Sequence, residues 1–364
     1  MKNISVKFDT NHNVEFYRTL QKRVRAHFKD NNISKHANAN MVIKTVFMLS
    51  LYLVPFVLLL TVFENAWIIY FMWVLMGFGL AGLGMSIMHD GSHSAYSKNK
   101  LINSISGWTL YLAGGSDKMW KIQHTVLHHT YTNVTGMDED IDPGKVMRFS
   151  PHEERLPFHK YQHIYAWFLY GLMTILWITS KDFKQARRYA KLGLLEMQNT
   201  NYKKILVNII LTKVLYYSIA LILPLIVSPA AWWVTVLGFL TMHYIAGLIL
   251  GLIFQPAHVV PSSNYPLPDE SGNIKADWAV SQLINTANFA PESGWFSWYV
   301  GGLNFQIEHH LFPNICHVHY KKLSKIVRET AAEFNLPYQT EKTFVGAVAT
   351  HGKMLKRLGR EDQL

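Results

Sequence analysis

Seven histidines in this chain fall into three short clusters. They are His89 and His93, then His124, His128 and His129, and finally His309 and His310. Neutral imidazole is a ligand that suits iron, zinc and copper. Two histidines four residues apart share one face of a helix and can bind one ion, whereas an adjacent pair points about 100° apart and can serve two ions. The three clusters together predict a two-metal oxidative site.

The charged residues are few and unevenly placed. Only 16% of the 364 residues are charged, against about a quarter in an average soluble chain. No Lys or Arg occurs from Thr45 to Ser97 or from Val214 to Ile274, although the net charge is +11. This pattern follows the positive-inside rule of membrane proteins and excludes a basic nucleic-acid-binding protein. Cys316 is the only cysteine, which excludes an intrachain disulfide.

Four apolar stretches are long enough to cross about 30 Å of hydrocarbon, which takes roughly 20 helical residues. They cover residues 43–63, 66–88, 206–227 and 231–254. The short connectors after the first and third stretches carry no basic residue, so we expect two helical hairpins that turn on the outer side. A fifth stretch, 164–180, would place the clusters on opposite sides if it crossed. We therefore expect it to lie in the interface or to re-enter.

These stretches predict an all-α membrane protein with four transmembrane helices and a cytosolic helical cap that holds the two metals. Residues 1–42 are expected to form a cytosolic N-terminal arm, 43–340 the membrane domain with its cap, and 341–364 a cytosolic tail. The basic arm lacks the apolar core of a cleaved signal peptide. Both termini and the metal site are therefore expected on the cytosolic side.

Other polar residues could support the clusters. His258 ends the fourth stretch and could complete the ligand shell, and Gln306 could bind a metal through its amide oxygen or orient a ligand. Asp90 and Glu308 are expected to accept hydrogen bonds from imidazole rings. The acidic run 138–142 lacks calcium-loop spacing, and we expect a solvated or bracing loop.

The remaining histidines are expected to lie outside the metal site. His159 and His163 are also four apart, but they adjoin the fifth apolar stretch and are interpreted as polar contacts. The expected solvated histidines are His12, His27, His36, His152 and His351.

In order, the clusters match the boxes HxxxH, HxxxHH and QxxHH, and from about residue 40 to 340 the chain resembles the membrane-bound fatty-acid desaturases. Glutamine at the start of the third box is similar to the front-end acyl desaturases, which insert a double bond between an existing one and the carboxyl end. The resemblance implies that the box histidines and His258 bind two non-haem irons that react with dioxygen. It also implies a cis alkene made on a fatty acyl substrate, carried as acyl-CoA or in a membrane lipid.

The source of electrons is expected to be a separate protein. Many eukaryotic front-end enzymes carry a fused cytochrome b5 domain marked by His-Pro-Gly-Gly, and that motif does not occur here. A small acidic donor such as ferredoxin or cytochrome b5 could dock on the basic segment 181–191.

Other functions could use clustered histidines. An acyl hydroxylase or ketolase would use the same boxes, and only its product would differ. A membrane haem protein would need opposed single histidines, and a metal transporter would place ionisable residues near the middle of the membrane.

Overall fold

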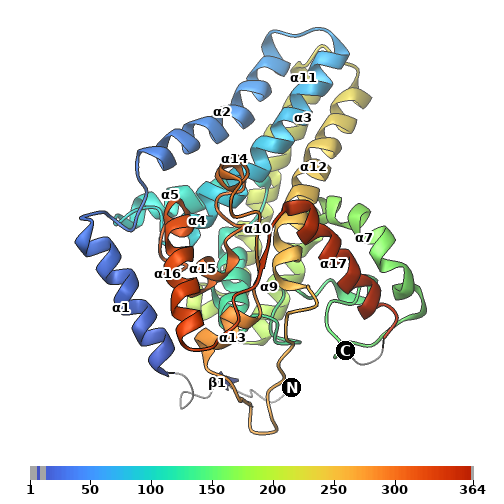
Figure 1. Ribbon diagram of the computed structural model, residues 1–364. Helices are drawn as coiled ribbons and strands as arrows, with labels where there is room; N and C mark the ends of the chain where they lie inside the picture. The colour runs from blue at the N-terminus through green and yellow to red at the C-terminus, as the bar shows by residue number, and fades with distance from the viewer. Residues whose placement is uncertain (1–5, 9–13, 362–364) are drawn as a thin grey trace. The chain divides into compact units, whose positions relative to one another are not determined.

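The computed structural model describes residues 6–8 and 14–361, which are mostly helical (Figure 1). His12, residues 1–5 of the predicted arm and residues 362–364 of the predicted tail lie outside the described residues. The chain divides into two compact units that alternate along the sequence. Residues 39–122 and 167–252 form one, called here the membrane unit. The other, the histidine-rich unit, comprises residues 1–38, 123–166 and 253–364.

Within residues 6–8 and 14–361, four helical stretches are long and apolar enough to span a membrane, which confirms the number predicted from the sequence. They are α2 (Ala39–Thr61), Ala66–Ser92 with α3 (Ala66–Leu83), Tyr202–Val227 with α10 (Tyr202–Tyr217), and α12 (Trp232–His258). The third stretch is interrupted by the π turn η8 (Ser218–Ile222) before α11 (Leu223–Val227). Pro224 explains the interruption, because proline lacks an N–H and its ring clashes with the carbonyl four residues earlier.

Glycines allow the membrane helices to approach closely. α3 begins after Asn65, whose side chain accepts hydrogen bonds from the N–H groups of Trp67 and Ile68. α2 and α3 lie side by side (Figure 1), and a Cβ atom at Gly79 would sit 2.8 Å from the backbone of Leu51. Small residues at such contacts are typical of helices packed in a membrane.

The fifth apolar stretch is not one continuous helix. It consists of α7 (Gln162–Gly171), α8 (Met173–Leu176) and the π turn η6 (Trp177–Lys181). None of these is among the candidate spans of the described residues. The membrane unit also contains α4 (His89–Ser92), α5 (Lys100–Trp108), η2 (Thr109–Ala113), α6 (Asp117–Trp120), α9 (Asp182–Lys191) and η7 (Leu194–Gln198).

A buried lysine joins three segments of the membrane unit. The ammonium group of Lys213, on α10, donates to the carbonyls of Gly114 and Trp177 and to Oδ2 of Asp182, each at 2.7 Å. All three ammonium hydrogens can therefore be satisfied, and the charge is neutralised by a carboxylate. An ionisable residue in a membrane helix is costly unless it is paired in this way.

The histidine-rich unit is built around two long helices. α1 (Val14–Asp30) and α16 (Tyr320–Glu333) lie side by side (Figure 1), and the Arg23 guanidinium pairs with the Glu333 carboxylate at 2.7 Å. The same core contains Leu20, Leu283 and Phe305. Further elements are η3 (Lys121–His128), η4 (Gly144–Val146), η5 (Pro157–Tyr161), α13 (Trp278–Ile284), α14 (Gly294–Tyr299), α15 (Gln306–Leu311), η9 (His317–His319) and α17 (Phe344–Leu358). Two parallel strand pairs join β1 (Lys7–Phe8) to β2 (Asn273–Ile274) and β3 (Asn288–Phe289) to β4 (Thr340–Glu341).

α17 lies within the predicted C-terminal tail and is anchored by buried side chains. The Arg148 guanidinium donates to the carbonyls of Leu358 at 2.7 Å and Glu361 at 2.8 Å. The Gln162 amide donates to the carbonyl of Leu355 at 2.8 Å. The bond to Leu358 satisfies a carbonyl at the end of α17, and the other two bind carbonyls of Leu355 within the helix and of Glu361 just after it.

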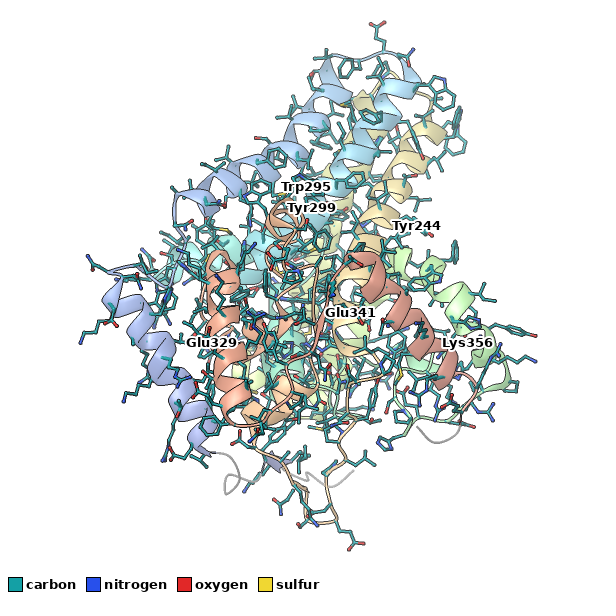
Figure 2. The ribbon with its side chains drawn as sticks, viewed as in Figure 1. Tyr244, Trp295, Tyr299, Glu329, Glu341 and Lys356 are labelled. Atoms are coloured by element: carbon teal, nitrogen blue, oxygen red, sulfur yellow. The ribbon has the colours of Figure 1, made fainter. Side chains whose placement is uncertain are left out.

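One aromatic pair of this unit includes an exposed tryptophan. Figure 2 shows Trp295 and Tyr299 together on α14, where their rings stack with centroids 6.2 Å apart. The Trp295 side chain is 77% exposed. Tyr299 is half-buried beneath it. Tryptophan and tyrosine are enriched where a protein meets the membrane interface.

Candidate metal centre

The second histidine cluster lies on a π-helical segment. η3 carries His124 and His128, and His129 follows directly. The wider turn brings both later rings close to the first, with centroids 5.2 Å from His124 to His128 and 4.8 Å from His124 to His129. Single π turns occur frequently at functional sites. The sequence pattern predicted an ordinary α-helical face instead.

The third cluster lies on α15, which begins after a tight glycine turn. Gly302 has φ +66°, and a Cβ atom there would lie 3.0 Å from the Cβ of His317, so the turn requires glycine on both grounds. The Asn304 amide donates to the carbonyl of Phe289 at 3.0 Å and fixes the start of the helix. His309 and His310 then lie buried on one turn.

Six histidines of the histidine-rich unit converge. They are His124, His128, His129, His258, His309 and His310, and all six are buried. Ligand atoms of His128, His258 and His310 lie within 4.8 Å of one another, and so do those of His129, His309 and His310. The adjacent rings His128 and His129 thus belong to different groups, and His310 is common to both.

Three of these rings have nitrogens that no hydrogen bond occupies, and together they are called here the open ligand set. Nε2 of His128, Nε2 of His310 and both nitrogens of His258 are buried without a hydrogen-bond partner. A buried ring nitrogen without a partner is costly, and a metal ion would satisfy it. Three convergent imidazole nitrogens are a donor set that fits iron, zinc or copper. This geometry places a candidate metal position within the histidine-rich unit.

Carboxylates orient two of the rings. Nδ1 of His128 donates to Asp138, whose two oxygens both lie 3.0 Å away, and Nδ1 of His124 donates to Asp140 at 3.1 Å. Such partners fix the ring orientation and increase its basicity. Burial alone would lower the pKa of His128, but Asp138 and Asp140 outweigh it and raise this pKa to about 9.

The neutral state is favoured at His310. Burial and the neighbouring rings of His129 and His128 hold the pKa of His310 well below its ordinary value. Its Nδ1 donates to Oε1 of Gln282 at 2.8 Å, which leaves Nε2 directed at the candidate metal position. Only the deprotonated ring nitrogen can bind a metal.

Comparison with known proteins identifies the family. The family model described as fatty acid desaturase matches residues 65–342. This chain belongs to the fatty acid desaturase family. It is 34% identical over 351 residues to the sn-1 linoleoyl-lipid 6-desaturase of Arthrospira platensis, a match covering 95% of this chain and 93% of that one. It is 35% identical over 362 residues to the acyl-lipid (8-3)-desaturase of Physcomitrium patens, covering 98% and 74%. The predicted resemblance is confirmed, and the protein is a desaturase, an oxidoreductase.

The first histidine pair of the desaturase belongs to the membrane unit. His89 and His93 lie at the ends of α4, where their rings are 4.8 Å apart. α4 packs closely on α5, because a Cβ atom at Gly91 would lie 2.6 Å from the backbone nitrogen of Gly107. Asp90, the predicted hydrogen-bond acceptor between them, is buried.

Two expectations about carboxylates need correction. Residues 138–142 were expected to form a solvated or bracing loop, and the solvated alternative is wrong for Asp138, which is buried and accepts from Nδ1 of His128. It also accepts hydrogen bonds from the N–H groups of Asn133 and Asp140, both at 2.9 Å, and so shapes its own loop. Glu308 instead accepts from Asn288 at 2.8 Å and from Tyr338 at 2.9 Å, and burial raises its pKa to about 7.

Two further supporting residues were not singled out from the sequence. Gln282 on α13 holds His310 and also accepts from Thr132 at 2.8 Å. The Asn133 amide donates at 3.0 Å to the carbonyl of His258, and so ties the loop after the second cluster to the end of α12. A glutamine in a short apolar helix carries no sequence signal of such a role. Asn133 has φ +61°, a conformation that asparagine tolerates better than most residues.

The other histidines have separate roles. His159 is buried, and its ring contacts the carbonyl of Lys145 at 2.9 Å and the N–H of Leu156 at 3.1 Å. His152 is exposed, as expected, and contacts the carbonyl of Tyr265 at 2.8 Å. His351 was expected to be solvated, and this is wrong. It is fully buried on α17, and its Nδ1 donates to the carbonyl of Val259, next to His258, at 2.8 Å.

The burial of His351 predicts a pH-dependent stability. Burial lowers its pKa to about 4, below the unfolded value of about 6.5. Between these values the unfolded chain binds the extra proton, so stability is lost as the pH falls from about 6.5 towards 4. For the metal-free protein we expect this ring to account for about 2 kcal/mol lost between pH 7 and pH 5.

The measurement compares the unfolding of wild type and His351→Gln at the two pH values. The variant should lose less stability on acidification, whereas the exposed control His152→Gln should behave like wild type. An equal loss in wild type and His351→Gln would contradict the assignment.

Proposed function

We propose that this desaturase is a dioxygen-dependent front-end enzyme that acts on acyl chains of membrane lipids. It would insert a cis double bond between an existing one and the carboxyl end. The open ligand set of His128, His258 and His310 is the observation that carries the proposal, since buried unpaired ring nitrogens fit a redox metal. The names of the two relatives, a linoleoyl-lipid 6-desaturase and an acyl-lipid (8-3)-desaturase, support the substrate class.

The proposed ligands hold two non-haem iron ions. They are His89, His93, His124, His128, His129, His258, His309 and His310, with Gln306 as a further candidate. Gln306 is buried, and neither its amide oxygen nor its amide nitrogen has a hydrogen-bond partner, which supports a role at a metal or at a metal-bound ligand. Neutral histidines suit an apolar setting, because they bring no added negative charge.

The protein orients the metal-binding rings and keeps bulk water away from them. The bound irons would supply the activation of dioxygen, which takes two electrons from the donor and two protons from solvent and is reduced to two waters, while two neighbouring methylenes each lose one hydrogen. Asp138 and Gln282 hold His128 and His310 in fixed orientations. Burial of the six converging rings excludes bulk water from them.

The topology and location follow from the same proposal. We infer two helical hairpins in the membrane, with both termini and the metal-binding histidines on the cytosolic side. The exposed Trp295, which stacks on the half-buried Tyr299, would meet the membrane interface. The predicted division into an arm (1–42), a membrane domain with its cap (43–340) and a tail (341–364) remains part of this proposal.

Lipid analysis tests the function directly. The desaturase is expressed in a host whose lipids contain one defined unsaturated acyl chain, and mass spectrometry locates any new double bond. We expect a new bond between the existing one and the carboxyl end, in chains still esterified to glycerolipid. A new bond on the methyl side would contradict the front-end assignment, and a hydroxylated or keto chain would contradict desaturation.

The electron donor is proposed to dock on α9. Lys184 and Arg187 are exposed on this helix, and Arg188 is half-buried beside them. The positive charge would attract a small acidic donor such as ferredoxin or cytochrome b5, and this attraction would weaken as the salt concentration rises.

Free acyl-CoA is the alternative to a membrane lipid as the carrier of the acyl substrate, and the same histidines could act on either.

Charge reversal tests this surface. We expect Lys184→Glu with Arg187→Glu to slow reduction by the donor about 10-fold at low salt, because favourable encounters become repulsive, and less at high salt. Stopped-flow reduction measures the rate, and Lys203→Glu with Lys204→Glu on α10 is the control. Unchanged reduction kinetics in the α9 variant would dismiss the docking surface.

A further inference from the structure

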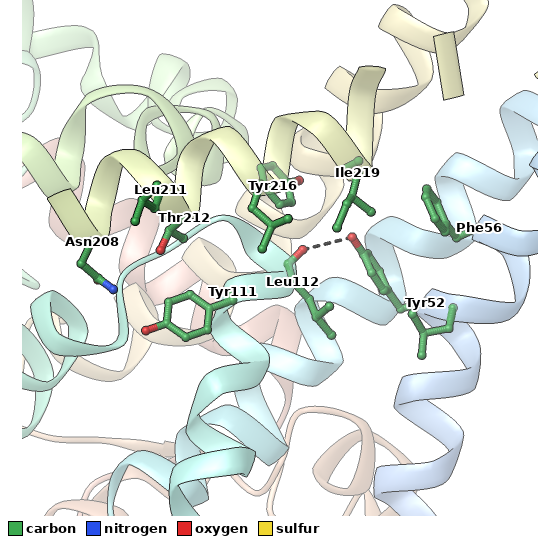
Figure 3. Close-up of a pocket in the computed structure, with 12 residues that line it drawn as sticks. Tyr52, Phe56, Tyr111, Leu112, Asn208, Leu211, Thr212, Tyr216 and Ile219 are labelled. Carbon is green, nitrogen blue, oxygen red and sulfur yellow. Dashed lines mark hydrogen bonds between the residues drawn. The ribbon is translucent and has the colours of Figure 1, made fainter. Parts of the chain in front are cut away.

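The membrane unit contains a groove that no step above uses. It has a volume of about 410 Å³ and lies between α2, η2 and α10 with η8 (Figure 3). Leu53 and Phe56 contribute from α2, Tyr111 and Leu112 from η2, and Leu211 and Leu215 from α10. Small-molecule sites have volumes of about 300–1,000 Å³, so the groove is large enough for a ligand.

The walls determine which kind of molecule can fill it. α2 and α10 belong to candidate membrane spans. Leu53, Leu211 and Leu215 are 42%, 62% and 62% exposed, and on a membrane helix such surfaces face hydrocarbon. A groove with these walls suits the acyl chains of a bilayer, because the hydrocarbon region excludes water.

The groove is polar at one end and apolar at the other. Asn208 and Tyr111 lie together at one end in Figure 3, whereas Phe56 and Ile219 lie at the opposite end. The –NH2 group of the Asn208 side chain, which lines this end, can donate a hydrogen bond to an ester carbonyl. Asn208 is also close to the start of α10, about 9 Å along the helix from Tyr202, and so near the edge of the hydrocarbon. This order of polarity matches a lipid whose ester end lies near Asn208.

The wall of the groove formed by η2 packs against the residue that precedes the first histidine pair. Tyr111 and Leu112 lie on η2, and the preceding Leu110 packs in one core cluster with Met88, the residue before His89. The Tyr52 hydroxyl donates to the carbonyl of Leu112 at 3.0 Å and joins α2 to the same wall. A chain in the groove therefore contacts η2, which packs against the residue before His89.

We propose that this groove holds one acyl chain of the glycerolipid on which the desaturase acts. The identity of that lipid as the substrate rests on the proposed function, whereas its binding does not. The ester group lies beside Asn208 and Tyr111, and the chain extends towards Phe56 and Ile219. An acyl chain on coenzyme A lacks the second chain and glycerol that would anchor it in this membrane-facing groove.

Lipid retention tests the binding. The full chain is placed in nanodiscs of dioleoyl phosphatidylcholine, extracted into mild detergent and examined by native mass spectrometry. We expect wild type to retain about one lipid per chain and Thr212→Trp, which fills the groove, to lose at least ~10-fold in lipid affinity. Val214→Trp is the matched control, because Val214 is exposed on the same helix outside the groove.

A second variant covers a failure of the first to fold. Asn208→Leu leaves the groove open but removes its polar end, and it should weaken retention about 5-fold. Lipid retention by the groove variants equal to that of wild type would overturn the proposal. So would wild-type protein that carries only detergent and no lipid.

The substrate claim has its own readout. Thr212→Trp should reduce the amount of desaturated lipid about 10-fold while the iron content stays unchanged. A Thr212→Trp protein that retains no lipid but keeps full activity would overturn the claim that the bound lipid is the substrate. Binding is repeated in His128→Ala, which should hold the lipid without catalysis. If wild type retains the lipid but makes no desaturated product, the proposed function fails and the groove remains a lipid site.

Discussion

Replacing His128 with alanine is expected to abolish desaturation while the membrane helices stay folded. His128 contributes an unpaired Nε2 to the group with His258 and His310, and its other nitrogen is held by Asp138. Without this ring the ion loses a ligand and its fixed position. We expect product to fall by at least ~10³-fold, with a matching loss of bound iron.

His163→Ala is the control for this experiment. His163 has the same four-residue spacing from His159 but is interpreted as a polar contact. It should retain near-normal iron and product. Circular dichroism confirms that both variants keep their helices. Normal activity in His128→Ala, or loss of iron in His163→Ala, would contradict the proposed ligand set.

Replacing Asp138 with asparagine is expected to reduce both iron affinity and activity by about 10–100-fold, the usual effect of losing a carboxylate behind a metal-binding histidine. Asparagine is nearly the same size but has no charge to hold Nδ1–H of His128. Its amide would also face an N–H of Asn133 or Asp140, where the carboxylate accepts two hydrogen bonds. Iron titration and product formation measure the change.

Asp142→Asn is the matched control, because Asp142 is exposed on the same loop and accepts from the N–H of Gly144 at 3.0 Å. Its iron affinity should stay within about 2-fold of wild type. Equal losses in the two variants would indicate a general effect of charge in the loop and would contradict the specific role of Asp138.

The membrane spans were predictable because their signal is local. About twenty mostly apolar residues with few charges identify a span from composition alone, and the four predicted stretches agree with the helices within a few residues. The family was predictable for a related reason, since each histidine box is a short pattern. The buried Lys213 was harder to recognise, because its partner Asp182 is 31 residues earlier in the chain.

The residues that support the metal centre depend on contacts distant in sequence. Asp138 lies in an acidic run that the sequence predicts to be a solvated or bracing loop, and its contact with His128 forms only in the folded chain. Gln282 meets His310 across 28 residues, and His351 meets Val259 across 92. The π turn at η3 also changes which histidine rings can approach one another, and the amino-acid composition does not predict this turn.

The metal content of purified, active protein tests the central claim most directly. Inductively coupled plasma mass spectrometry on the detergent-purified desaturase, combined with a turnover assay on the same sample, should give about two iron ions per chain in proportion to activity. Haem absorbance should be absent. Full activity in protein that contains no iron would contradict the account.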